Sequence, residues 1–124
     1  MARSARAGEL RTRVMFFDFP RDEKGEIEQD MDGYEATERV NILGEGAFRM
    51  CKWTNAWGSE VYTARQAGVR EPATLTLRFN SKITSTCIVY RGRDPHPYEV
   101  ISLNDVGDRH VWLEIKVERM AAAK

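Results

Sequence analysis

Four short runs in the last fifty residues alternate apolar and polar side chains: ATLTLRF, CIVYR, YEVISLN and HVWLEIKVER. Successive side chains of a β-strand point to opposite faces, so this alternation puts one set in a core and the other in solvent. The pattern predicts a half-buried antiparallel sheet and not a helix bundle. The residues expected to face the core include Leu75, Leu77, Phe79, Val111, Leu113, Ile115 and Val117.

Length and charge limit the classes of protein that this chain can belong to. With 124 residues and 42% hydrophobic content, residues 1–124 are expected to form one domain with one modest core. Nineteen basic residues balance nineteen acidic ones. The chain therefore lacks the overall positive field of a protein whose main partner is free nucleic acid.

Compartment and redox state follow from the same composition. Apolar runs such as 14–17 are too short to span a membrane, and the basic start MARSAR has no apolar stretch that would make it a secretory signal. We expect a protein made and kept in a reducing cytoplasm. Cys51 and Cys87 are expected to be buried thiols and not a disulfide.

The first expected strand, residues 9–19, has apolar side chains on both faces. Leu10, Thr12, Val14 and Phe16 share one face, whereas Met15, Phe17 and Phe19 lie on the other. A soluble domain seldom leaves such a second face bare, so something must cover it. Pro20 then ends the strand, because it has no amide hydrogen to donate.

An acidic segment follows the first strand. Residues 21–33 hold six carboxylates, two basic residues and two glycines, and they contain too little apolar surface to order themselves. The composition predicts a long mobile loop. Its carboxylates are Asp22, Glu23, Glu26, Glu28, Asp30 and Asp32.

The middle of the chain is expected to contain two strands and one ambiguous segment. Residues 38–43 and 48–57 are expected to be strands around a turn at 44–46. Residues 60–67 fit either one short helix, capped by Ser59, or an extended segment. Turn residues separate the later strands at 80–85, 92–97 and 104–108. The end of the chain, 120–124, is expected to be a flexible tail.

No catalytic, cofactor-binding or metal-binding motif is present. His96 and His110 have no second ligand at metal spacing, and the fragment GEG at 44–46 lacks the lysine and the third glycine of a phosphate loop. No carboxylate pair lies in an apolar setting that would shift its pKa. We expect a protein that is not an enzyme and that uses no cofactor.

The tryptophans suggest a surface that binds another molecule. Trp53 and Trp57 do not both fit strict alternation without a bulge, and Trp112 falls on the polar face of its strand. An outward tryptophan beside Arg78 and Lys116 could stack on bases, as in OB-like single-strand-binding folds. A subunit interface is the favoured alternative, because the neutral chain lacks the electrostatic attraction that sequence-tolerant nucleic-acid binding uses.

Taken in order, the motifs resemble the head-tail joining proteins of tailed bacteriophages, also called head-closure or stopper proteins. The resemblance covers nearly the whole chain, through GELRTRV, GSEVYTAR, EPATLTLRFNSKI, YRGR, YEVISLNDVG and RHVWLEIKVER. The stretch between Trp53 and Glu60 is shorter than in the family, and the acidic segment is longer. The best-matched residues are Gly8, Glu9, Leu10, Arg13, Glu60, Tyr62, Ala64, Thr76, Arg78, Ile83, Tyr98, Val100, Ile101, Trp112 and Leu113.

The resemblance implies a small antiparallel β-barrel without catalytic activity in the virion. Six or twelve copies would form a ring below the portal and its adaptor, close the DNA channel after packaging, and present a surface to the tail terminator or tail-completion protein. Double-stranded DNA would pass through the lumen without sequence-specific binding. Adaptor or tail-completion proteins of the same connector are the nearest alternatives.

Two sets of residues are candidate functional sites within such a ring. The six carboxylates of the acidic loop would line the channel and repel the phosphates of passing DNA, or they would form an ordinary solvated surface. The apolar second face of the first strand needs a neighbour, and ring closure buries such a patch without forming a filament. The residues expected at the subunit interface are Met15, Phe17, Phe19, Trp57 and Trp112.

Overall fold

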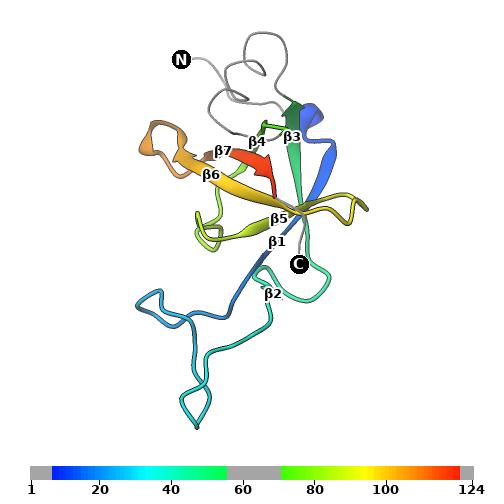
Figure 1. Cartoon of the computed structure of the whole chain (residues 1–124). Helices are drawn as coiled ribbons and strands as arrows, with labels where there is room; N and C mark the ends of the chain where they lie inside the picture. Colours follow the sequence, from blue (N-terminus) through cyan, green and yellow to red (C-terminus); the bar gives the residue numbers. More distant parts are fainter. Residues whose placement is uncertain (1–6, 56–70, 121–124) are drawn as a thin grey trace.

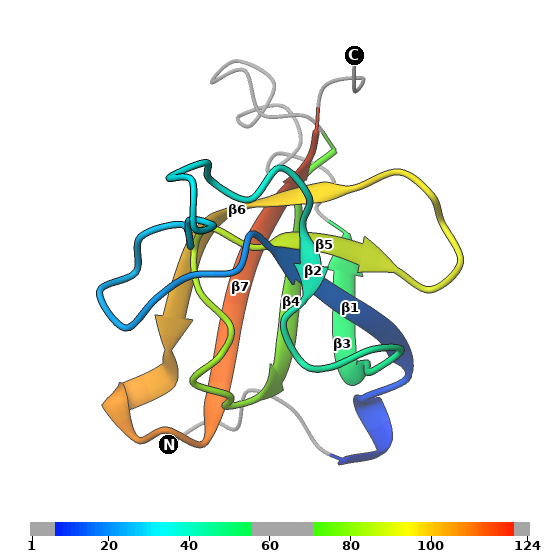
Figure 2. The same ribbon diagram turned by 90° about the horizontal axis from the view of Figure 1, so that it is seen from below.

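The computed structural model describes residues 7–55 and 71–120. Within them the expected all-β class is confirmed: six strands close an antiparallel barrel, and a seventh, short strand extends it (Figure 1, Figure 2). The barrel order is β1-β3-β4-β7-β6-β5, and β5 pairs back onto β1. The strands are β1 (Thr12–Asp18), β2 (Val40–Asn41), β3 (Arg49–Asn55), β4 (Ala73–Arg78), β5 (Ile88–Arg91), β6 (Tyr98–Asp105) and β7 (Trp112–Arg119).

The core is formed by the inward side chains that alternation predicted on β4 and β7. Leu75, Leu77, Leu113, Ile115 and Val117 are all at most 1% exposed. They share the interior with residues of the other strands, namely Val14, Phe16, Cys51, Val89 and Tyr98. Alternation therefore identified most of the core correctly.

Val111 is an exception, and its predicted inward position is wrong. It is 49% exposed and precedes the first residue of β7. His110, just before it, has a positive φ of 56°, so the chain is still turning at this point. Alternation predicts a face only where the backbone is extended, and here the strand begins one residue later.

β1 occupies a central place because it pairs on both sides. Its first half pairs with β3, through Thr12 and Cys51, and its second half pairs with β2, through Phe17 and Asn41. The whole length from 14 to 17 pairs with β5. The strand starts at Thr12 and not at Glu9, because a 3-10 turn, η1 (Ala7–Glu9), precedes it.

The cysteines and turns agree with the sequence expectations. Cys51 and Cys87 are free and buried, and burial raises the pKa of the Cys51 thiol to about 12. Gly44 and Gly46 form the expected turn between β2 and β3, with positive φ angles of 117° and 70°. A second 3-10 turn, η2 (Val106–Asp108), follows β6.

Some expectations fall outside the part of the chain that the structure describes. The segment expected as a short helix or an extended stretch, 60–67, lies there, as do Trp57 and residues 121–124. Among residues 7–55 and 71–120, no helix has the length and apolar character needed to cross a membrane.

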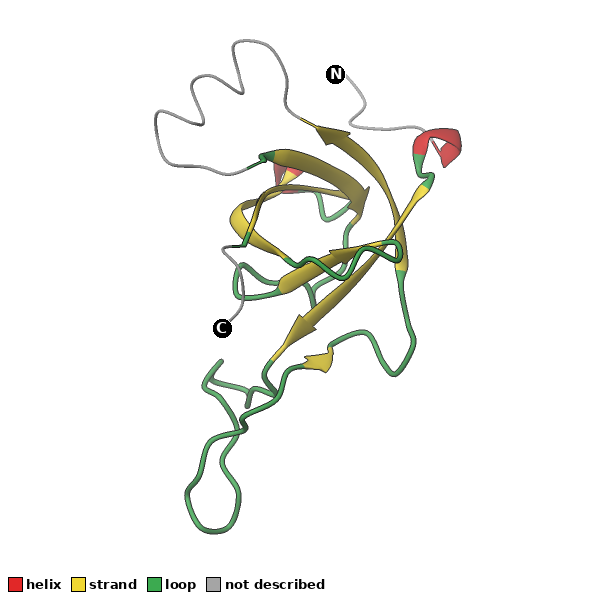
Figure 3. Ribbon diagram, turned by 45° about the vertical axis from the view of Figure 1, so that its right-hand side comes forward, coloured by secondary structure: helices red, strands yellow, loops and turns green. Residues whose placement is uncertain are grey.

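Residues 20–36 form an acidic arm that extends away from the barrel (Figure 1, Figure 3). The chain runs out and back twice. The amide of Glu28 donates to the carbonyl oxygen of Pro20 over 2.8 Å, and the amide of Ala36 donates to the carbonyl oxygen of Glu28 over 3.1 Å. The composition predicted a loop but not these backbone bonds. The mobility of the arm stays a prediction.

Candidate assembly surface

The outer face of β1 carries the first group of residues expected at an interface. Met15 and Phe17 point away from the core and are half-buried. Tyr90 of β5 is the cross-strand partner of Met15, and its ring meets Phe17 edge-on at 5.4 Å between centroids. Part of the apolar second face is therefore covered within the chain, by β5.

Phe19 lies apart from this pair, at the base of the acidic arm. The guanidinium carbon of Arg39 lies 4.7 Å from the centre of its ring. Such a cation–π contact contributes about 0.5–1 kcal/mol at an exposed site. The three residues expected on one face of the first strand thus have two different environments.

Trp112 belongs to a separate part of the surface, at the other end of the barrel. It starts β7 opposite Arg78 of β4, whose guanidinium carbon lies 5.2 Å from the tryptophan ring centre. Arg13 of β1 repeats the arrangement, 4.2 Å from the ring centre of Phe48. Met50 of β3 pairs directly with Arg13 and is 39% exposed.

These five residues form one row across four strands. The register pairs Lys52 of β3 with Thr76 of β4. The pairing ends there, and we infer from its register that Met50 and Arg78, two residues further on, lie side by side on the outside of the barrel. We call the set Arg13, Phe48, Met50, Arg78 and Trp112 the arginine–aromatic row. Sequence analysis found only Trp112 and Arg78 of it, because the other three become neighbours only when β1 and β3 pair.

The arm presents all six carboxylates of the predicted channel-facing set to solvent. Two turns of the same construction shape it. Asp22 accepts from the amides of Lys24 and Glu26, and Asp30 accepts in the same way from the amides of Asp32 and Tyr34.

A glycine with positive φ completes each turn of the arm, at 83° in Gly25 and 85° in Gly33. This D-x-x-G repeat is visible in the sequence. It specifies turns because the aspartate side chain accepts hydrogen bonds from amides of the turn, and glycine adopts the positive φ that the turn requires.

Two large apolar side chains stand at the far turn of the arm. Met31 is 105% exposed and Tyr34 is 73% exposed. Neither has a role in the fold of the described residues. Exposed apolar side chains at the end of a charged projection are typical of a contact made with another molecule.

The base of the arm is fixed by a buried carboxylate that sequence analysis missed. Asp18 is 4% exposed, and it accepts hydrogen bonds from the amide of Phe19, from Arg21 Nε at 2.9 Å and from Thr86 Oγ1 at 2.6 Å. Burial raises the pKa of Asp18, but the bonds from Arg21, Thr86 and Phe19 outweigh it, and the pKa is lowered overall. Thr86 is 68 residues away, so only the fold reveals this contact.

A pair of acids lies on the outside of the barrel, where Glu99 of β6 faces Glu118 of β7. The hydrogen bond shared with Glu118, together with burial and charge repulsion, raises the pKa of Glu99. A carboxyl group whose pKa is higher in the folded state than in the unfolded state contributes its full stabilisation of the fold only at pH values below the unfolded pKa. That contribution is lost as the pH rises through the folded value.

Replacing Glu118 with glutamine should therefore stabilise the protein at pH 7 by up to about 1 kcal/mol and should have little effect near pH 4. Urea unfolding at both pH values measures this difference. Glu114→Gln is the matched control, because Glu114 faces Thr76 and Asn104 and not another acid. Equal shifts for both variants would contradict the assignment.

The histidines lie on exposed turns. His110 Nδ1 contacts Asp105 Oδ2, and the amide of His96 donates to Asp94. Among residues 7–55 and 71–120, no group of three or more histidine, cysteine or acidic side chains could hold a metal ion.

Neither a protein-family model nor a curated protein matches this chain. The solution structure of protein SF1141 from Shigella flexneri 2a resembles it with a TM-score of 0.65 at 16% sequence identity. The match covers 96% of this chain and 100% of that chain. At this identity the likeness establishes a shared fold and nothing further.

Proposed function

We propose that this chain is a structural subunit of the head–tail connector of a tailed bacteriophage. It forms a ring that closes the DNA channel after packaging and provides the surface to which the tail attaches. The order of motifs along the chain supports the proposal through their resemblance to head-closure proteins. The structural observation that carries it is the arginine–aromatic row on the outside of a closed barrel.

A closed barrel limits how subunits can join. Strands that are already paired on both sides cannot add a neighbouring strand, so neighbours must meet through side chains and loops. Arginine, methionine and aromatic residues are enriched at protein interfaces, and the row consists of these types alone. Repeated around a closed symmetry, one such contact per subunit builds a ring.

In this role the partners are other copies of the chain, the portal and adaptor on the head side, and a tail terminator or tail-completion protein on the tail side. Packaged double-stranded DNA passes through the lumen. The protein is made in the host cytoplasm and resides in the virion, and its role requires no catalysis and no cofactor. The resemblance implies six or twelve copies.

The acidic arm has two candidate destinations in the ring. One is the channel, where its six carboxylates would repel DNA phosphates. The other is the neighbouring subunit. Exposure of Met31 and Tyr34 at the far turn favours the neighbour, because a wall that only repels phosphate needs no apolar side chains.

Cryo-electron microscopy of the purified protein mixed with its portal–adaptor complex tests the proposal. We expect a ring bound below the adaptor, with its other side free for the tail. A ring above that position would instead identify an adaptor, and a ring bound only to the tail would identify a tail-completion protein. Absence of binding to any of these complexes would contradict the proposal.

A second candidate function is binding of single-stranded nucleic acid. Aromatic side chains next to arginines are also the groups that stack on bases and neutralise phosphates. Binding of this kind is strongly salt-dependent. A labelled oligonucleotide that binds with a steep salt dependence, while the protein stays monomeric beside the connector, would favour this function.

We expect the outer face of β1, which β5 covers only in part, to contact a neighbouring subunit in addition to the row, so replacing Phe17 with glutamate should block assembly and leave a folded monomer. Its ring contacts Tyr90 outside the core, so we expect a loss of about 1–2 kcal/mol in unfolding free energy. Circular dichroism and native mass spectrometry measure fold and assembly. Thr54→Glu, at an exposed position of β3, is the control. Normal ring formation by the Phe17 variant would remove this face from the interface.

A further inference from the structure

We propose that the acidic arm of one copy docks on the arginine–aromatic row of the next copy. This inference rests on the proposed ring, and it specifies the contact that builds it. The arm supplies carboxylates and two exposed apolar side chains. The row supplies two guanidinium groups and the apolar side chains of Phe48, Met50 and Trp112.

The arm and the row carry opposite charges. The arm holds seven acidic and two basic side chains, a net charge of −5. The other described residues carry a net charge of only +1, so the barrel as a whole has no strong positive field. The attraction between two copies is therefore local, between the carboxylates of the arm and Arg13 and Arg78 of the row.

The guanidinium groups of the row are available for such a contact. Arg21 and Arg119 each form an ion pair with a carboxylate of their own chain. Arg13 and Arg78 form no ion pair among the described residues, and each lies over an aromatic ring. A guanidinium held flat against a ring keeps its N–H groups directed outward, where a carboxylate can accept from them.

The apolar parts of the two surfaces also correspond. Met31 and Tyr34 are the most exposed large apolar side chains of the described residues. Phe48 and Met50 of the row are 38% and 39% exposed. A contact that buries these four side chains and pairs the surrounding charges has an apolar centre and a polar rim, as stable interfaces do.

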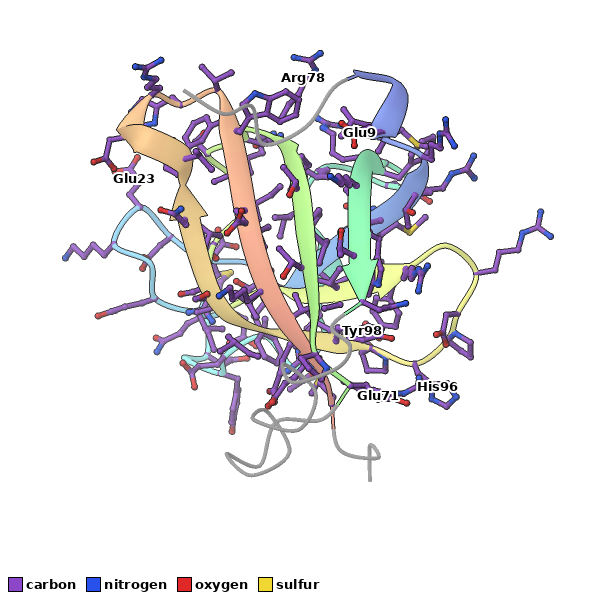
Figure 4. All side chains as sticks on the ribbon, turned by 90° about the horizontal axis from the view of Figure 1, so that it is seen from above. Glu9, Glu23, Glu71, Arg78, His96 and Tyr98 are labelled. Carbon is purple, nitrogen blue, oxygen red and sulfur yellow. The ribbon has the colours of Figure 1, made fainter. Side chains whose placement is uncertain are left out.

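The two surfaces lie at opposite ends of β1. Arg13 stands near its start and the arm leaves from its end, after Asp18 (Figure 1). Figure 4 labels Arg78 of the row at the top of the view and Glu23 of the arm at its upper left. Because the arm projects away from the barrel at the end of β1 that is far from Arg13 (Figure 1), we infer that it reaches the row of another copy and not its own. A contact between unlike surfaces repeats from copy to copy and closes into a ring when the rotation allows it.

Charge reversal on each side tests the contact in the full chain. The arm variant carries Glu23→Lys, Glu28→Lys and Asp32→Lys, which leaves the turn-forming Asp22 and Asp30 intact. The row variant carries Arg13→Glu and Arg78→Glu. Sedimentation velocity and native mass spectrometry measure self-association. If the wild-type chain associates only on the connector, binding to the portal–adaptor complex is measured for the same set.

We expect each variant alone to associate at least tenfold more weakly than the wild-type chain. An equimolar mixture of the two should recover association to within about threefold, because every contact in an alternating ring then joins opposite charges. Arg93→Glu, a charge change of the same sign on an exposed turn, is the control and should associate normally. Circular dichroism must show that all variants are folded.

Several results would overturn the inference. They are normal association of either variant, failure of the mixture to recover, or loss of oligonucleotide binding by the row variant while its self-association is unchanged. The inference and the proposed function fail separately. Rings that form through arm and row but bind no connector would contradict only the function. Connector rings that form despite both reversals would contradict only the docking contact.

Discussion

Replacing Asp18 with alanine is expected to lower the free energy of unfolding by about 3 kcal/mol. The substitution removes the acceptor of four hydrogen bonds, two of them from Arg21, and leaves the Arg21 guanidinium, which is 29% exposed, without its partner. Hydrogen bonds to charged groups and buried pairs are costly to break from one side only. Urea unfolding at pH 7 measures the loss. Asp22→Ala is the control, since this carboxylate is exposed and accepts only local amides.

The pH dependence of unfolding provides an independent reading of the same site. The folded pKa of Asp18 is lowered, so its contribution is fully present above the unfolded value, about 3.9, and is lost as the pH falls through the folded value. The wild-type protein should therefore lose stability on acidification below about pH 4. Asp18→Asn should show a flatter dependence there. An identical acid profile for the two proteins would contradict the assignment.

Removing the acidic arm should abolish assembly while the barrel stays folded. We expect replacement of residues 22–35 by a four-residue glycine–serine linker to change the unfolding free energy by no more than about 1 kcal/mol, because a shorter loop costs less entropy to close. Arg21 is kept, so its pair with Asp18 remains. Thermal unfolding measures stability, and native mass spectrometry with the connector measures assembly.

Filled heads that carry the armless protein should lose their DNA, because the closing ring is absent or incomplete. The release of DNA from purified heads measures this effect. A variant that keeps Asp22 to Gly25 and lacks only the second turn, 30–34, tests whether Met31 and Tyr34 are the necessary part. A large drop in melting temperature for either variant would show that the arm packs on the barrel. Normal rings would show that it is not needed for assembly.

The sequence determined which faces of β4 and β7 are buried. Leu75, Leu77, Leu113 and Ile115 were assigned correctly because side-chain alternation is a local property of extended backbone. It also determined the arm as a separate segment, since residues 21–33 have too few apolar groups to join a core. The same rule failed at Val111, where the backbone is still turning and alternation no longer applies.

Only the tertiary structure determined which surfaces exist. Asp18 became a buried anchor because Thr86, 68 residues away, closes over it. Arg13, Met50 and Trp112 became one row because β1, β3, β4 and β7 are neighbours in the barrel. Strand order and register depend on pairing between distant segments, which no local pattern encodes. The sequence alone therefore supplied the core and the acidic arm, and the closed barrel supplied the surface on which we propose that the arm docks.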